Sequence, residues 1–274
     1  MASVDTGTEQ LLAVVDDGVA TITFNRPHKR NALSDELTPA LRESLLRFDE
    51  DPGVRVVVLT GAGPAFCAGG DVSGMGSKPQ PPGAVKRTFQ DGVRELQRKQ
   101  ETLTLRLFDL SKPTIAALPG PAAGAGFSIA LACDLRLAAE SAFVTTAFAN
   151  IGLSGDYGAS WLLPQLVGIA KAKELFFTSR RVGAAEGLAL GIFNEVVDDD
   201  RLAERTAELA RTIADGPPVA LRYMKENLNR ALSADLRTCL ALEADRMSRS
   251  AQTQDHREAV AAFLGKRAPV FKGQ

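Results

Sequence analysis

The sequence has few of the side chains from which metal sites and disulfide frameworks are built. Its 274 residues include three cysteines and two histidines. Cys67, Cys133 and Cys239 are an odd number without CxxC spacing, which fits a reducing cytosol better than a disulfide scaffold. His28 and His256 lie far apart in sequence, which disfavours a histidine-based zinc site and a Ser-His-Asp triad. We therefore expect no metal site and a cytoplasmic location.

Long apolar runs and an excess of one charge are missing too. No segment approaches the ~18 consecutive apolar residues of a membrane span. The N-terminal stretch MASVDTGTEQ lacks the basic-then-apolar order of a secretory signal. The formal net charge is −1, so no basic field favours nucleic acid or a membrane surface. We expect neither as a partner. The phosphate-loop pattern GxxxxGK[ST] and the dinucleotide pattern GxGxxG at a βαβ unit are also absent.

Alternating short strands and helices in the first part of the chain predict an α/β core. Leu11–Val15 and Val19–Phe24 predict a β-hairpin, and the continuous apolar run Val54–Leu59 predicts a strand covered on both faces. Residues 84–110 and Ala125–Ala132 are expected to be helical, with a short strand at 114–118 between them. The segment 73–83 is rich in Gly, Pro and Ser and is the best candidate for a mobile loop.

From about Asp200 the pattern changes to helices alone. Four helices are expected, at Arg201–Asp215, Pro218–Leu232, Leu236–Ser250 and Thr253–Leu264. We divide the chain into an α/β core at 1–200, which carries the site, and a helical C-terminal region at 201–274. No linker is long enough to separate two independent domains.

Two loops of small residues follow predicted strands. They are AFCAGGD at Ala65–Asp71 and PGPAAGAGFSIALACD at Pro119–Asp134. Small side chains let the backbone approach a ligand closely, and free N–H groups at a helix start carry the positive end of its dipole. Together the loops could present two backbone donors to one developing oxyanion. The alternative is that each loop is only a packing turn between a strand and a helix.

Five blocks in order make a family resemblance. They are Asn25-Arg26-Pro27 with Arg30-Asn31-Ala32-Leu33, the two loops, IGLSGDYGASWLLPQLVG at Ile151–Gly168, and FLGKRAPVFKG at Phe263–Gly273. In this order they resemble the crotonase (enoyl-CoA hydratase/isomerase) superfamily. The resemblance implies an α/β spiral of ββα units capped by C-terminal helices, assembled as homotrimers or homohexamers. It also implies an acyl-CoA thioester substrate and no cofactor beyond the coenzyme A that the substrate carries.

The resemblance assigns roles to particular residues. Gly70 and Ala125 match the two backbone N–H groups that hold the thioester oxygen. Coenzyme A contacts are carried over onto Lys29, Arg30, Ala32, Ala68, Asp71, Phe263 and Lys266. The last two match the aromatic residue and the lysine that reach the adenine and phosphates of coenzyme A, in the same or a neighbouring subunit. The alternatives are that the charged members are solvated surface and that Asp71 caps a short helix.

The acid positions depart from the family pattern. Hydratases of this family carry one Glu where Ser128 stands and a second where Phe148 falls by spacing. Asp156 is the acid that remains in this stretch, and its alternative role is to cap the following helix or to form an Asx turn. We expect double-bond isomerisation of an enoyl-CoA with Asp156 as acid/base. The other hypotheses are a hydratase with atypical acids and a CoA-binding member without turnover.

Overall fold

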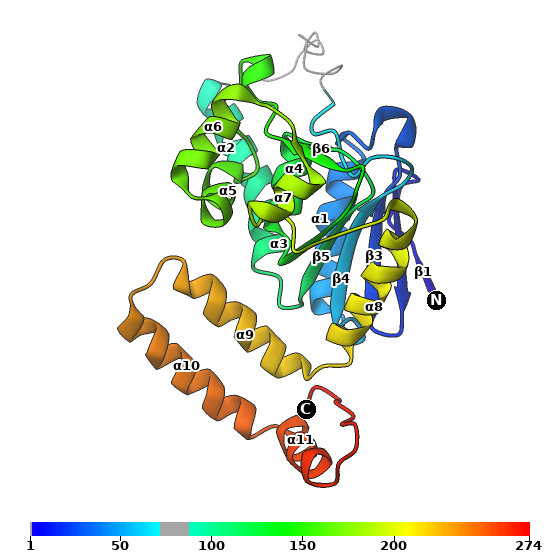
Figure 1. Cartoon of the computed structure of the whole chain (residues 1–274), viewed down its shortest axis with the longest axis vertical. Coiled ribbons are helices and arrows are strands. Elements are labelled where there is room, and N and C mark those ends of the chain that lie inside the picture. Colours follow the sequence, from blue (N-terminus) through cyan, green and yellow to red (C-terminus); the bar gives the residue numbers. More distant parts are fainter. Residues whose placement is uncertain (1, 72–87) are drawn as a thin grey trace.

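The computed structural model describes residues 2–71 and 88–274 (Figure 1). The expected mobile loop at 73–83 and the first residues of the expected helix at 84–110 lie outside these ranges. The main sheet has seven strands in the order β1-β2-β3-β4-β5-β7-β10. Their bounds are Ala2–Val4 (β1), Leu11–Asp16 (β2), Val19–Phe24 (β3), Val56–Gly61 (β4), Thr114–Leu118 (β5), Leu135–Ala139 (β7) and Glu195–Val197 (β10).

The order of this sheet follows from the local patterns. The expected hairpin is confirmed, because β2 and β3 pair antiparallel from Leu11↔Phe24 to Asp16↔Val19. From β3 onwards the neighbours are parallel. In β4 the successive residues Val56 to Leu59 are all buried, and since successive side chains point to opposite faces, both faces of the sheet are covered. Three strands of this sheet, β1, β7 and β10, were not predicted individually from the sequence.

Helices cover the sheet and then leave it. The helices of the core are α1 (Leu37–Glu50), α2 (Phe89–Gln100), α3 (Arg106–Phe108), α4 (Ala125–Ala132), α5 (Ala159–Val167), α6 (Ile169–Thr178), α7 (Ala184–Ala189) and α8 (Leu202–Ala214). Short 3₁₀ helices are η1 (Pro27–Lys29), η4 (Ala149–Ile151) and η5 (Asp199–Arg201), and a π-helical turn, η3 (Glu101–Leu105), joins α2 to α3. All eight residues of α4 are buried.

A small second sheet lies at the ends of the main strands. It contains β6 (Ala122–Ala123), β8 (Phe143–Thr145) and β9 (Val182–Gly183), in that order. β6 pairs parallel with β8, and β8 pairs antiparallel with β9. Because β6 immediately precedes α4, this sheet fixes where that helix begins.

The four expected C-terminal helices are confirmed to within a few residues. They are α8 and then α9 (Pro218–Ala231), α10 (Leu236–Ala251) and α11 (Gln254–Leu264). The helix α8 packs on β4, β5 and β7, and in Figure 1 it lies in front of the sheet. Only helices follow the expected boundary near residue 200. The first of them, α8, nevertheless packs against the sheet and so belongs to the core. The helices α9 to α11, which we call the arm, extend away from it (Figure 1).

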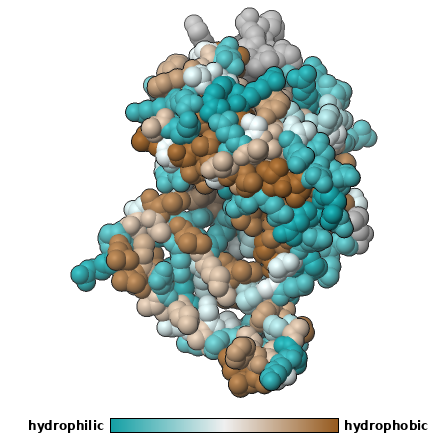
Figure 2. Space-filling model, in the orientation of Figure 1, coloured by the Kyte–Doolittle hydropathy of each residue, from teal (hydrophilic) through white to brown (hydrophobic). Residues whose placement is uncertain are grey.

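Apolar side chains lie open on the arm. Figure 2 shows hydrophobic surface along it and in the hollow between it and the core. The most exposed members are Leu228, Leu236, Met247, Phe263 and Leu264. In the described part of the chain, no helix has the length and hydropathy needed to cross a bilayer.

Candidate active site

Backbone hydrogen bonds join the two small-residue loops. The first loop pairs with the turn after η1, because Leu33 N donates to Gly69 O at 2.8 Å and Asp71 N donates to Leu33 O at 3.1 Å. It pairs on its other side with the second loop through the parallel bridge Cys67↔Ala122. The two loops, which were predicted separately from the sequence, therefore lie side by side at the start of α4 and are joined by backbone hydrogen bonds.

The two predicted oxyanion donors keep unpaired N–H groups within the described ranges. Gly70 lies opposite Leu33 in a parallel bridge whose two hydrogen bonds use Gly69 and Asp71. Ala125 is the first residue of α4, so its N–H has no intrahelical partner. Neither N–H donates to a carbonyl of residues 2–71 or 88–274. Both amides are therefore available to an oxygen supplied by a ligand.

Glycine is required where the loops touch. Gly69 has a φ of +91°, and a methyl group there would lie 2.8 Å from Ala123 O and 3.4 Å from Ala125 N. A methyl group on Gly126 would lie 2.3 Å from Cys67 O, far inside contact distance. The alternative that these are only packing turns accounts for the close approach, but it leaves two neighbouring amides unpaired.

Asp156 lies beside the second loop and does not cap α5. That helix starts after Gly158 without a side-chain cap. The Asp156 Oδ1 atom instead accepts hydrogen bonds from Tyr157 N at 2.8 Å and from Gln100 Nε2 at 2.6 Å. Since Tyr157 N precedes the helix, the expected alternative of a capping carboxylate is not what holds this side chain.

The environment of Asp156 favours a carboxyl that exchanges protons. Burial raises the pKa of Asp156, and the two hydrogen bonds from Tyr157 N and Gln100 lower it again in part. A carboxyl with a raised pKa binds its proton more tightly than an exposed one, which suits a group that takes up and returns a proton near neutral pH.

The two positions that would hold hydratase acids have other functions here. Ser128 is fully buried, and its Oγ lies 3.1 Å from Gly124 O and 2.9 Å from Asp156 O. One hydroxyl thus joins the second loop to the Asp156 turn. Phe148 is buried and stacks on Phe176, with ring centroids 6.1 Å apart. The Phe148 ring lies next to Gly124, since a methyl group on Gly124 would be 3.7 Å from it. The position where family hydratases carry the second carboxylate is therefore apolar in this chain.

Five of the predicted coenzyme A residues come together. Ala68 N donates to Arg30 O at 2.9 Å, and Ala32 N donates to Lys29 O at 3.1 Å. Asp71 Oδ2 lies 3.2 Å from Arg26 Nη2 in a half-buried ion pair, and the short helix that Asp71 was alternatively expected to cap lies outside the described residues. Arg26 also donates to Ala32 O. The turn 26–33 and the loop 65–71 therefore form one surface.

The remaining two predicted coenzyme A residues are not part of that surface in a single chain. Phe263 is 84% exposed and lies in α11, and Lys266 follows that helix in an exposed turn with a φ of +50°. In Figure 1 α11 lies at the bottom of the view, whereas α4 lies inside the core above the arm. Within one chain, these two side chains are therefore not brought together with the surface formed by the loops.

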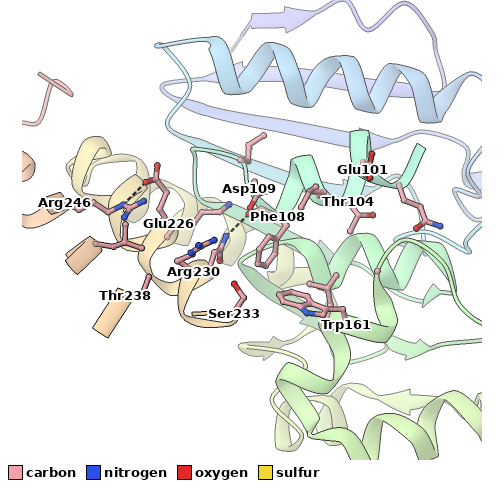
Figure 3. Close-up of a pocket in the computed structure, with 18 residues that line it drawn as sticks. Glu101, Thr104, Phe108, Asp109, Trp161, Glu226, Arg230, Ser233, Thr238 and Arg246 are labelled. Atoms are coloured by element: carbon pink, nitrogen blue, oxygen red, sulfur yellow. Dashed lines mark hydrogen bonds and ion pairs between the residues drawn. The ribbon is translucent and has the colours of Figure 1, made fainter. Parts of the chain in front are cut away.

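Two cavities lie next to residues of the predicted site. The smaller, about 540 Å³, is lined by Arg30 and Ala68 from the predicted coenzyme A surface and by Ala123 of the second loop. The larger, about 790 Å³, separates the core from the arm, and Gln100 and Gly158, which flank Asp156, line it. Figure 3 shows Phe108 and Trp161 on its core side, facing Glu226 and Arg230 of α9.

Other reactive groups are structural. Burial raises the pKa of the Cys67 thiol to about 12, so this cysteine beside the first loop stays protonated and packs as a small apolar residue. In the two described ranges, no group of three or more His, Cys, Asp or Glu side chains could hold a metal ion.

Sequence reasoning missed three contributors to the site. Gln100 contacts Asp156 across 56 positions of sequence, Phe176 stacks on Phe148, and Asn31 is fully buried with its Nδ2 donating to Ala65 O at 2.7 Å. A signal existed for Gln100, since it shares a helix face with Phe89, Val93 and Leu96 at spacings of three and four. Nothing local marks Phe176.

Comparisons with known proteins agree with this geometry. Residues 15–274 match the family described as Enoyl-CoA hydratase/isomerase. The chain is 38% identical to 1,2-epoxyphenylacetyl-CoA isomerase of Escherichia coli, over 97% of this chain and 99% of that protein. It is 34% identical to the short-chain-enoyl-CoA hydratase of Clostridium acetobutylicum, over 91% and 92%.

The fold agrees as well. The crystal structure of an enoyl-CoA hydratase from Bacillus anthracis superposes with a TM-score of 0.89 at 33% identity, covering 97% of this chain and 100% of that one. A structure of a putative enoyl-CoA hydratase from Streptomyces coelicolor gives 0.88 at 34% identity, covering 97% and 95%. The expected crotonase-like α/β fold is thereby confirmed, and the chain belongs to the enoyl-CoA hydratase/isomerase family.

Proposed function

We propose that this protein moves a double bond along the acyl chain of an enoyl-CoA, with Asp156 as the acid/base. The observation that carries the proposal is the position of this carboxylate. Its main-chain carbonyl is tied through the Ser128 hydroxyl to the loop that begins α4, while Ser128 and Phe148 fill the places of the hydratase acids. One carboxylate is enough to take a proton from one carbon and return it to another.

The chemistry requires an oxyanion hole, which we assign to the N–H groups of Gly70 and Ala125. The thioester oxygen accepts both hydrogen bonds, and a donor of this kind contributes ~2.7–4 kcal/mol in other enzymes. For a 3-enoyl-CoA, Asp156 takes the proton from C2 and the electron pair spreads over the dienolate to the thioester oxygen. The electron pair then returns, C4 takes the proton back from Asp156, and the double bond lies between C2 and C3.

Hydration is the alternative within the family. The relatives include proteins named as hydratases as well as isomerases, so family membership does not choose between them. Hydration needs a water held at the double bond, and family hydratases hold it between two acids. The buried ring of Phe148, stacked on Phe176, takes up space there and offers no hydrogen bond. A lost general acid or base costs ~10²–10⁴ in rate, which favours isomerisation.

Coenzyme A binding is assigned to the surface made by Lys29, Arg30, Ala32, Ala68 and Asp71. The support is that these residues adjoin and that Arg30 and Ala68 line the smaller cavity. Phe263 and Lys266 then come from a neighbouring chain, so we propose a homotrimer or homohexamer. The exposed leucines of the arm provide the apolar surface for such contacts. The reaction uses no cofactor other than the coenzyme A of the substrate.

The test is product analysis in heavy water. The protein is incubated with 3-enoyl-CoA and with 2-enoyl-CoA, and products are separated and weighed by mass spectrometry. We expect double-bond migration with solvent deuterium entering the acyl chain to outpace formation of 3-hydroxyacyl-CoA. Rapid hydration without migration or exchange would make the protein a hydratase. No turnover of either, with coenzyme A still bound, would make it a binding member of the family.

A further inference from the structure

We propose that Gln100 is a positioning residue for this reaction, which holds the Asp156 carboxylate by one oxygen so that the other, Oδ2, meets the acyl carbons. The inference rests on the proposed role of Asp156. It assigns a function to a side chain of α2 that the oxyanion hole and the coenzyme A surface do not use.

The two carboxylate oxygens of Asp156 are not equivalent. Oδ1 accepts from Gln100 Nε2 at 2.6 Å and from Tyr157 N at 2.8 Å. Oδ2 accepts from no group among residues 2–71 and 88–274. Two donors on one oxygen fix the plane of the carboxylate and leave the lone pairs of the other oxygen for a proton. Tyr157 N holds the carboxylate from its own turn, so Gln100 decides the orientation from the opposite side.

The fold brings Gln100 to this place by an unusual helix. Gln100 ends α2, and the π-helical turn η3 follows it directly. Such turns are rare and are frequently found at functional sites. Leu103 and Leu107, which follow on the same side, are fully buried. These two leucines anchor the helix in the core, so the amide of Gln100 is held where the larger cavity meets the Asp156 turn.

A neutral donor suits this position because few charges approach Asp156. In its own turn Tyr157 carries a titratable hydroxyl, and Arg42 of α1 donates to that hydroxyl at 3.4 Å. The helix α4 offers only the Ser128 hydroxyl, which binds the Asp156 carbonyl. From α6 the Phe176 ring packs against Gly155. Next to Gln100, the Glu101 carboxylate accepts from Gln97 at 2.8 Å. The amide of Gln100 donates at every pH and lowers the carboxyl pKa that burial raises.

The test compares variants of similar length in the full chain. Gln100→Met keeps the shape and removes the donor. We expect kcat for isomerisation to fall about tenfold, KM to change less than about twofold, and the acid limb of the pH–rate profile to move up by about one unit. Gln97→Met, one turn earlier on α2, is the matched control and should leave all three unchanged. Gln100→Leu is the second variant if the methionine variant does not fold.

Gln100→Glu gives a sharper readout. Its introduced carboxyl can donate only while protonated, so activity relative to Gln100→Met should recover at low pH and disappear as pH rises. If Gln100 had a purely structural role, the activity of Gln100→Glu relative to Gln100→Met would not depend on pH in this way. If the wild type isomerises and Gln100→Met keeps its kcat and its pH profile, Gln100 has no positioning role and the inference is wrong. If the wild type neither isomerises nor exchanges deuterium, the proposed function fails as well, so the two failures are distinguishable.

Discussion

Two helices of this chain show how differently its parts are used. Every one of the eight residues of α4 is buried, whereas none of the 16 residues of α10 is. Around α4 the backbone is held so closely that glycine is required, and the proposed oxyanion donors and Asp156 depend on that packing. Around α10 large apolar side chains are open, among them Leu236 at 73% and Leu240 at 55% exposed. The proposed oxyanion donors and acid/base all lie in the core, whereas the arm leaves large apolar side chains open in the single chain.

The largest effect is expected in the region around α4. Asp156→Asn keeps the size of the side chain and an oxygen that can accept from Tyr157 N, but it cannot take a proton. We expect isomerisation to fall ~10²–10⁴-fold with the oligomer and the fold unchanged, measured by steady-state kinetics, circular dichroism and sedimentation. Isomerisation at the wild-type rate would remove Asp156 from the mechanism.

A second prediction compares a glycine-to-alanine substitution in the closely packed loop region with the same substitution on the exposed surface. Gly126→Ala places a methyl group 2.3 Å from Cys67 O, whereas Gly92→Ala meets nothing within 4 Å on the exposed helix α2. We expect Gly126→Ala to lower the free energy of unfolding by about 3 kcal/mol or more. Gly92→Ala should raise it by ~0.5–1 kcal/mol, because alanine loses less chain entropy in a helix. Urea unfolding of both variants measures this, and equal effects would mean that the two loops are not in close contact.

The third prediction concerns the arm. The double variant Leu236→Glu with Leu240→Glu places two charges on one face of α10. We expect a stable core that sediments as a monomer at micromolar concentration. KM for the acyl-CoA should rise roughly tenfold, equal to ~1.4 kcal/mol, because Phe263 and Lys266 no longer reach a neighbour. Arg237→Glu, on another face of α10, is the control. A wild type that is itself monomeric would overturn the proposed assembly.

The smallest effect concerns how the free energy of unfolding depends on pH. Burial raises the pKa of folded Asp156 above its unfolded value, so the folded state binds this proton more tightly. The resulting stabilisation is full below the unfolded pKa and is lost as pH rises through the folded one. Asp156→Asn should therefore be no less stable than the wild type at pH 7, with a gain of about 0.5 kcal/mol, because partial exposure screens the charge. Thermal unfolding at pH 4 and pH 7 tests the sign.

Local sequence patterns were enough to predict much of the fold. Alternation predicted the β2–β3 hairpin, the apolar run at Val54–Leu59 predicted a strand buried on both faces, and helical periodicity located α8 to α11 within a few residues. These signals are strong because each depends on near neighbours in the chain. The strand β1 was missed because its residues Ala2–Val4 are mostly exposed and gain their partner only by pairing with β2.

What the sequence by itself determined is the family, the order of most elements and the residues proposed for the chemistry. Small residues in the two loops, and an acid at 156 with none at 128 and 148, can be read directly, because residue type and spacing record them. Only the tertiary structure decided which groups meet. It joined Ser128 to the Asp156 carbonyl, placed Gln100 on Oδ1 across 56 positions and left Phe263 remote from the loops. Contacts of this kind depend on how distant segments pack, and packing is a property of the whole chain.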